Sequence, residues 1–376
     1  MGVQRVLEAS PSGRAFLQEH GLRFDNPPTY ANYFVSLRSR RRCDLAREVG
    51  LALIGQIEPG LCDRLADIPE LSKYECFAAD GHWHKAAAHD PRHEGTKMPV
   101  GHFYSLNLRT HTLRHLAARE GLHEHDMSAL KRIKPKGLRQ GVAQGRRVLM
   151  VYDKAAIDFG YWKRCRQECA VYFLSRVKEN LVLEWMEDLP WKGADERNAG
   201  IIHDCKVKSR EGHVLRLIMY QDPQTGTVYQ FLTNEMDLPP GVVAELYRRR
   251  WEAEKVFDEV KNKLGQKKAW GSSLAAKQTQ AQMIALTHNL LLSYEQKLEK
   301  QHSLRNVAED HRRRRRVDSL KKECDRMSWP VPSLLLLARR ATQCSVKFIR
   351  WLRQAIRDKL AETLAVARLR ALYAML

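Results

Sequence analysis

The sequence predicts a mixed α/β protein, with a central sheet flanked by helices and a helical module at each end of the chain. Two short apolar segments, starting near Tyr74 and Arg147, each lead into an aspartate, as strands of a central sheet often do. A charged amphipathic helix is expected over residues 247–261. The outer regions, 1–73 and 301–376, show helical periodicity.

The first module, residues 1–73, is expected to be helical with one break at Asp25-Asn26-Pro27-Pro28. Four arginines, at positions 38 and 40–42, give it a basic face. Such a face could contact DNA ends or mediate dimerisation. The alternative is an ordinary packing module with a solvated face.

Residues 74–180 are predicted to form the first part of the core. In order, we expect a strand from Tyr74 to Asp80, a second over 101–108, a third starting near Arg109, a helical segment over 126–138, a strand over 147–153 and a strand over 170–175. If the first and fourth of these segments are central and adjacent, Asp80 and Asp153 project at the same end of the sheet.

These two aspartates predict a metal site if a later helix brings Glu254 beside them. Three converging carboxylates repel one another unless cations neutralise them. Carboxylates and water are the preferred ligands of Mg²⁺, and two such ions can activate an attacking oxygen and stabilise a leaving one. We therefore expect two Mg²⁺ ions, with Mn²⁺ able to replace them. For either aspartate alone, the alternative is a turn-forming role.

Residues 181–239 are predicted to form a β-rich segment before the charged helix. Segments 214–220 and 227–233 have strand character and are joined by a turn at 222–226, and residues 201–207 suggest a further strand. Trp185 and Trp191 in this region could stack on an unpaired base. The alternative for each is a buried core tryptophan.

Residues 240–300 are expected to contain the catalytic helix and the end of the core. On one continuous helix, Tyr247, Arg250, Glu254 and Lys261 would fall within an arc of about 60°. A carboxylate in such a row can bind a metal ion while the neighbouring cations and the phenol hold a phosphate. The alternative is a solvated helix in which Arg250 and Glu254 form a stabilising i, i+4 pair.

Charge indicates a polyanionic partner. The chain has a formal net charge of +20, and residues 301–376 alone contain 18 Lys and Arg against 7 Asp and Glu, with five consecutive arginines at 312–316. Basic groups placed on phosphates release counterions, which favours DNA or RNA. For the arginine run itself, a solubilising or disordered segment is the alternative.

Composition and motifs exclude several other classes. With 44% hydrophobic and 29% charged residues the chain should be globular, and no apolar run is long enough for a membrane span or a secretory signal, so we expect cytoplasmic residence and no membrane partner. The eight cysteines contain no Cys-x2-Cys pair. No phosphate-binding Gly-x4-Gly-Lys loop or Gly-x-Ser-x-Gly elbow is present.

The spacing Tyr247-x2-Arg250-x3-Glu254-x6-Lys261 resembles the helix signature of insertion-sequence-4-type DDE transposases. This resemblance implies an RNase H-like core interrupted by a β insertion, with Asp80, Asp153 and Glu254 as the catalytic triad. It also implies that the other three signature residues grip DNA phosphate. The segment from Asp153 to Trp162 is similar to the region of the family that carries the second aspartate.

The resemblance implies a DNA transposase that cuts transposon ends at their terminal inverted repeats and joins the 3′ hydroxyl to target DNA. It also implies a homodimer that pairs two ends. Two alternatives are a metal-dependent DNA nuclease that does not join strands and a non-catalytic DNA-binding protein derived from a transposase. Asp90 and Asp158 compete with Asp80 and Asp153, and the strand-terminal member of each pair is preferred. A transition-metal site at His82, His84 and His89 is not favoured, because a fourth ligand is missing.

Overall fold

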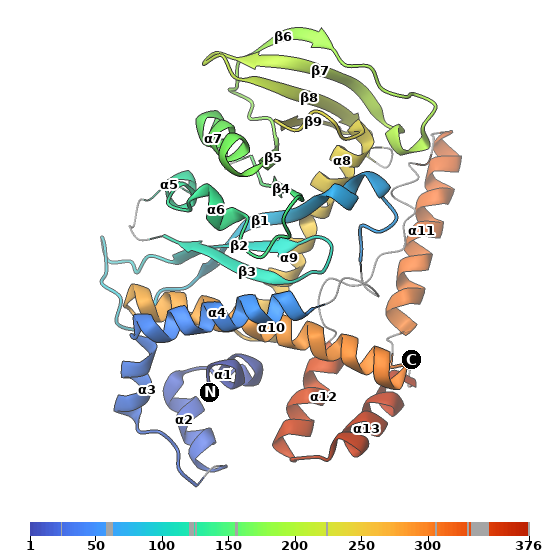
Figure 1. Cartoon of the computed structure of the whole chain (residues 1–376). Helices are drawn as coiled ribbons and strands as arrows, with labels where there is room; N and C mark the ends of the chain where they lie inside the picture. Colours follow the sequence, from blue (N-terminus) through green and yellow to red (C-terminus); the bar gives the residue numbers. More distant parts are fainter. Residues whose placement is uncertain are drawn as a thin grey trace.

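A large mixed sheet flanked by helices forms the centre of the molecule (Figure 1). The computed structural model describes residues 1–23, 25–57, 63–119, 124, 126–154, 157–222, 225–304, 307–328, 331 and 346–374. Within these residues the sheet has nine strands in the order β3-β2-β1-β4-β5-β9-β8-β7-β6. The predicted mixed α/β class is confirmed. No helix in the described ranges is long and apolar enough to cross a bilayer.

The strands have the following bounds: β1 Tyr74–His84, β2 Val100–Asn107, β3 Leu113–Ala118, β4 Arg147–Val151, β5 Val171–Arg176, β6 Leu183–Asp188, β7 Ile201–Ser209, β8 Val214–Gln221 and β9 Val228–Thr233. The sequence predicts eight of these segments, and it misses β6, which lies at the sheet edge and is mostly exposed. An exposed edge strand lacks the alternation of apolar and polar residues that marks a half-buried one.

The helices are α1 Gly2–Glu8, α2 Gly13–Gly21, α3 Tyr30–Leu37, α4 Arg40–Gln56, α5 Asp126–Lys131, α6 Pro135–Leu138, α7 Phe159–Cys169, α8 Pro240–Arg249, α9 Trp251–Asp258, α10 Leu274–His302, α11 Val307–Met327, α12 Val346–Arg357 and α13 Glu362–Ala374. Two 3₁₀ turns, Pro69–Lys73 and Glu196–Asn198, and a π-helical turn, Glu259–Lys263, complete the set. The arginine run at 312–316 lies on α11.

The first three strands form an antiparallel meander, and β4 and β5 then add parallel to β1. The parallel pairing of β1 with β4 sets the geometry of the site. In this pairing Tyr74 lies opposite Arg147 and Ala78 opposite Val151. Strand β9 pairs antiparallel with β5. The strands of segment 181–239 therefore extend the same sheet (Figure 1).

Helix α10 lies between the sheet and helices α1, α2, α12 and α13 (Figure 1). One hydrophobic cluster contains Phe16 of α2, Ile284 and Leu291 of α10, and Phe348 and Trp351 of α12. The two ends of the chain thus share one core on α10. Burying these side chains stabilises the arrangement, at roughly 1.5–3 kcal/mol for each large apolar group.

The helical segment that carries the signature is not the single helix that the sequence predicts. Helix α8 ends at Arg249 and α9 begins at Trp251, because the Arg250 N–H bonds the Tyr247 carbonyl and the Ala253 N–H bonds the Arg250 carbonyl, at 3.0 Å each. These are i to i+3 bonds, so the α-helical ladder is interrupted at Arg250. The π-helical turn that follows α9 holds Lys261.

Part of the C-terminal module that is expected to be helical, residues 332–345 with the apolar stripe Leu334–Leu337, lies outside the described residues.

Candidate active site

Register brings the two predicted aspartates side by side. The strand expected to end at Asp80 instead runs on to His84, because Asp80 and the residues after it pair with β2, whereas Asp153 does follow the end of β4. Paired residues of β1 and β4 differ by 73 in number (147 − 74 and 151 − 78), and Asp153 and Asp80 differ by the same 73. Both aspartates therefore stand two residues beyond the last pair, on neighbouring chains about 4.8 Å apart. Each carboxylate accepts a hydrogen bond of 2.8 Å from the next backbone N–H, at Gly81 and Lys154.

Arg250 joins the sheet carboxylate to the helix carboxylate. Its Nη1 donates to Asp80 Oδ2 at 3.0 Å, and its Nη2 donates to Glu254 Oε1 at 2.9 Å. The Tyr247 hydroxyl lies 3.5 Å from Asp153 Oδ1. Helix α9 packs against β1. The structure thus binds Asp80 and Glu254 to one guanidinium and brings Asp153 near it, beside the Tyr247 hydroxyl.

The electrostatics show that negative charge accumulates here. Burial raises the pKa of Asp80, and Glu254 and Asp153 raise it further, whereas Arg250 opposes this shift. Burial lowers the pKa of Arg250, but the net shift is upward because the three carboxylates and Tyr247 favour the charged guanidinium. Burial also raises the pKa of Tyr247 to about 12, so its hydroxyl is a donor at neutral pH. The pKa of Asp80 stays raised because the effect of burial outweighs the attraction of Arg250, and the two neighbouring carboxylates add to the rise.

This charge balance fits a divalent cation. Three carboxylates and one guanidinium leave a net charge of two negative units, which one divalent cation would neutralise. The donors are all carboxylate oxygens, which suit Mg²⁺. Within the described ranges, however, no three carboxylate, imidazole or thiol groups are arranged to hold one metal ion. Arg250 stands between Asp80 and Glu254 instead. The chemistry of the donors fits, and the cluster is held open by the arginine.

Lys261, on the π-helical turn, lies near the part of β1 that follows Asp80. Its charge acts on His82, which follows Asp80 by two residues, and burial together with Lys261 lowers the pKa of His82 to about 4. His82 and His84 are on one face of β1, as strand alternation predicts, with ring centroids 4.8 Å apart. The structure therefore places Lys261 beside the site, and no hydrogen bond of the described residues links it to the three carboxylates.

The two predicted stacking tryptophans are not brought to the carboxylates. Trp185 is on β6, five strands from β4, which corresponds to about 24 Å at the usual strand spacing. Its side chain is 60% exposed, and its Nε1 donates to Asp188 at 3.0 Å. Trp191 lines a surface hollow just after β6. The buried-core alternative is therefore wrong for Trp185.

The two competing carboxylates have other partners. Asp158 caps α7 by accepting from the Tyr161 N–H at 2.8 Å, and it pairs with Lys131. Asp90 accepts from the Ala87 N–H at 2.6 Å and pairs with Lys277 at 3.1 Å. Neither is in the set of groups around Arg250.

A buried ionic layer beneath the site was not anticipated from the sequence. Glu252 bonds His111 Nε2 at 2.5 Å, and Glu259 bonds His288 Nδ1 at 3.1 Å while His288 Nε2 contacts the His111 carbonyl. Burial raises the pKa of Glu252. His111, with smaller effects of Arg249 and Arg64, outweighs burial and lowers this pKa to about 2. These contacts fix α9 to the sheet and to α10. The seven-residue spacing of the two glutamates on one helix face was the available signal.

Trp251 is the second feature that the sequence did not single out. It begins α9 directly after Arg250, and its side chain is 60% exposed. Buried aromatic rings are common, but an exposed tryptophan at the edge of a charged site offers a flat apolar surface.

Fold and site together define a mixed α/β protein with a carboxylate cluster where β4 ends beside the parallel strand β1. Residues 107–290 match the family model described as the transposase DDE domain. This range includes Asp153 and Glu254 and begins after Asp80. A curated relative, the putative transposase y4zB of Sinorhizobium fredii (strain NBRC 101917 / NGR234), is 27% identical over 120 residues. The alignment covers 30% of this chain and 33% of that relative.

Proposed function

We propose that this chain is a DNA transposase of the insertion-sequence-4 type, with an RNase H-like core, that cuts transposon ends and joins the 3′ hydroxyl to target DNA. The observation that carries the proposal is the gathering of Asp80, Asp153 and Glu254 around Arg250. The strand order β3-β2-β1-β4-β5, with the first three antiparallel, supports the core assignment. The family match supports the activity.

Asp80, Asp153 and Glu254 are the residues that would hold two Mg²⁺ ions. When bound, such ions activate the attacking oxygen and stabilise the leaving oxygen of a phosphodiester. The protein itself supplies position and charge. The Arg250 guanidinium is fixed by two carboxylates, and its charge would attract a phosphate held beside them.

Tyr247 and Lys261 extend this grip. The Tyr247 hydroxyl keeps its proton at neutral pH, so it can donate to a phosphate oxygen. Lys261 on the π-helical turn supplies a second cation beside His82. These two residues and Arg250 hold the DNA backbone near the carboxylates in the proposal.

The rest of the chain is assigned to DNA and subunit contacts. A net charge of +20 suits the terminal inverted repeats and the target DNA. We assign residues 1–73 to DNA-end or dimer contact, segment 181–239 to holding a distorted end through Trp185 and Trp191, and residues 301–376 to a basic module. A homodimer would pair the two ends.

The test uses labelled duplexes that carry the inverted repeats flanking the coding region, incubated with Mg²⁺. Three variants, D80N, D153N and E254Q, should each lose cleavage by about 1000-fold or more, since a catalytic metal is worth several kcal/mol. The matched controls D90N, D158N and D258N remove carboxylates nearby in sequence. Asn remains a good helix cap at 158. Control activity within a few-fold of wild type supports the assignment.

Equal losses in a site variant and its control would overturn it. Joining is tested separately with a pre-cut end, whose free 3′ hydroxyl should appear in a product linked to target DNA. Cleavage without such a product would instead identify a nuclease. Binding without either reaction would identify a DNA-binding protein derived from a transposase.

A further inference from the structure

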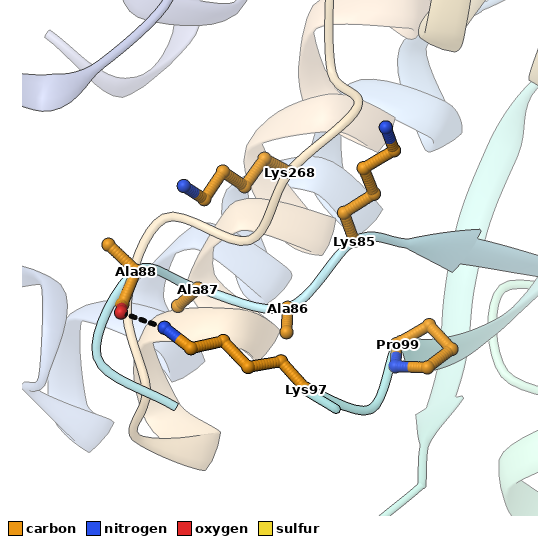
Figure 2. A pocket seen from close by; sticks show the side chains of 7 residues that line it. All are labelled: Lys85, Ala86, Ala87, Ala88, Lys97, Pro99 and Lys268. Atoms are coloured by element: carbon orange, nitrogen blue, oxygen red, sulfur yellow. Dashed lines mark hydrogen bonds between the residues drawn. The ribbon is translucent and has the colours of Figure 1, made fainter. Parts of the chain in front are cut away.

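A surface hollow of about 400 Å³ lies where the chain leaves β1 (Figure 2). Its lining contains three lysines and no acidic residue: Lys85, Ala86, Ala87, Ala88, Lys97, Pro99 and Lys268. The salt bridges of the described residues include none from these lysines. Three uncompensated cations around one concave surface make it a candidate site for an anion.

The backbone that forms the hollow is held in place from several sides. The Lys85 N–H bonds the Lys267 carbonyl and the Ala269 N–H bonds the Lys85 carbonyl, at 2.9 Å each. Ala87, Val100 and Ala269 form a small apolar cluster of their own. Asp90 accepts a hydrogen bond from the Ala87 N–H and forms an ion pair with Lys277. The cations therefore stand on a preformed loop, and the nearest buried carboxylate is already paired.

The lysines differ in how they are engaged. Lys97 donates its amino group to the Ala88 carbonyl, which closes one side of the loop (Figure 2). The amino groups of Lys85 and Lys268 make no bond to the other lining residues in the same view. These two side chains are exposed, and Lys267 beside them is also exposed. Their charges are available to a ligand.

The position of the hollow relates it to the carboxylates. Lys85 follows Asp80 by five residues (85 − 80), or about 17 Å along an extended chain. Lys268 follows Glu254 along the segment through the π-helical turn, and the two segments meet in the Lys85–Lys268 bridge. Lys261 lies between, beside His82. Both chain segments that carry site carboxylates thus lead to the same basic hollow.

We propose that this hollow binds a phosphodiester of the DNA backbone about five base pairs from the cut site. The distance follows from a rise of about 3.4 Å per base pair along one strand. Lys85 and Lys268 pair with phosphate oxygens, and Lys261 holds the backbone between the hollow and the carboxylates. This inference rests on the proposed function, because it takes the substrate to be DNA.

The test compares DNA binding by wild type, the double variant K85A/K268A and the control K163A/K300A. The control removes two other exposed lysines, on α7 and α10, and the same charge. In a plot of log affinity against log salt concentration, the double variant should lose about one unit of slope for each phosphate contact removed. The control should keep the wild-type slope. Thermal unfolding shows whether all three proteins are folded.

The position of the bound phosphate along the DNA is tested by replacing single phosphates of the duplex with neutral methylphosphonates. One position about five base pairs from the cut should weaken binding of wild type and leave the double variant unaffected. Equal slopes for the double variant and the control, or no position with this pattern, would overturn the proposal. A melting temperature raised by inorganic phosphate in wild type alone, with an unchanged DNA slope, would identify a free-anion site and also overturn it.

These outcomes are separable from the fate of the proposed function. A wild-type protein that cuts DNA while the double variant behaves as the control refutes the hollow alone. A wild-type protein that binds DNA with the predicted slope difference and does not cut refutes the transposase function alone.

Discussion

Removing the charge of Arg250 should destabilise the metal-free protein and make its stability depend on divalent metal. The Arg250 side chain is 8% exposed, whereas those of Asp80 and Glu254 are 22% and 39% exposed. Breaking a fully buried ion pair costs about 3–5 kcal/mol and breaking an exposed pair less than about 1 kcal/mol. For R250Q, whose carboxylate partners are partly exposed, we expect a loss of about 2 kcal/mol in the free energy of unfolding, or a fall of about 2–3 °C in melting temperature for a chain of this length.

Added Mn²⁺ or Mg²⁺ should raise the melting temperature of R250Q more than that of wild type, because the carboxylates then have no other cation. The control is R248Q on α8, where Arg248 pairs with Glu245 at 2.9 Å and its side chain is 41% exposed. We expect a change of at most about 1 kcal/mol there and no added metal response. Scanning calorimetry with and without metal measures both. An R250Q midpoint equal to that of wild type, or no extra response to metal, would refute the reasoning.

Two further predictions concern the buried histidines and Trp251. Burial lowers the pKa of His115 to about 4 and that of His102 well below 6.5. Below about pH 6.5 these histidines are therefore protonated in the unfolded state and neutral in the folded state. The free energy of unfolding should then fall by about 1.4 kcal/mol for each histidine and each pH unit of acidification. Urea unfolding at pH 7.5 and 5.5 checks this, and equal free energies would contradict it. W251A should weaken DNA binding by about tenfold through lost base stacking, with an unchanged melting temperature; an unchanged dissociation constant would show that Trp251 does not contact DNA.

The sequence predicts local structure and part of the site because these depend on neighbouring residues. Apolar runs with an aspartate at the end mark β1 and β4, and the signature offsets place Tyr247, Arg250 and Glu254 close together. The sequence does not show that Asp80 and Asp153 share one register, which follows from a parallel pairing of distant segments.

Long-range packing also explains what was missed. The helix is interrupted at Arg250 although no glycine or proline is nearby, so the sequence does not predict the interruption. His102 and His115 come within 3.2 Å only because β2 and β3 pair. The bridge between Lys85 and Lys268 likewise joins two segments that are far apart in the sequence. None of these contacts leaves a periodic pattern in the chain.

The central claim is that three carboxylates far apart in the sequence surround shared divalent ions. The most direct measurement replaces Mg²⁺ with Fe²⁺ and adds ascorbate and peroxide, so that hydroxyl radicals cut the backbone close to the bound ion. We predict cuts near Asp80, Asp153 and Glu254 together, suppressed by excess Mg²⁺ and lost in D153N. Cuts at only one of these segments, or cuts that Mg²⁺ does not suppress, would contradict the claim.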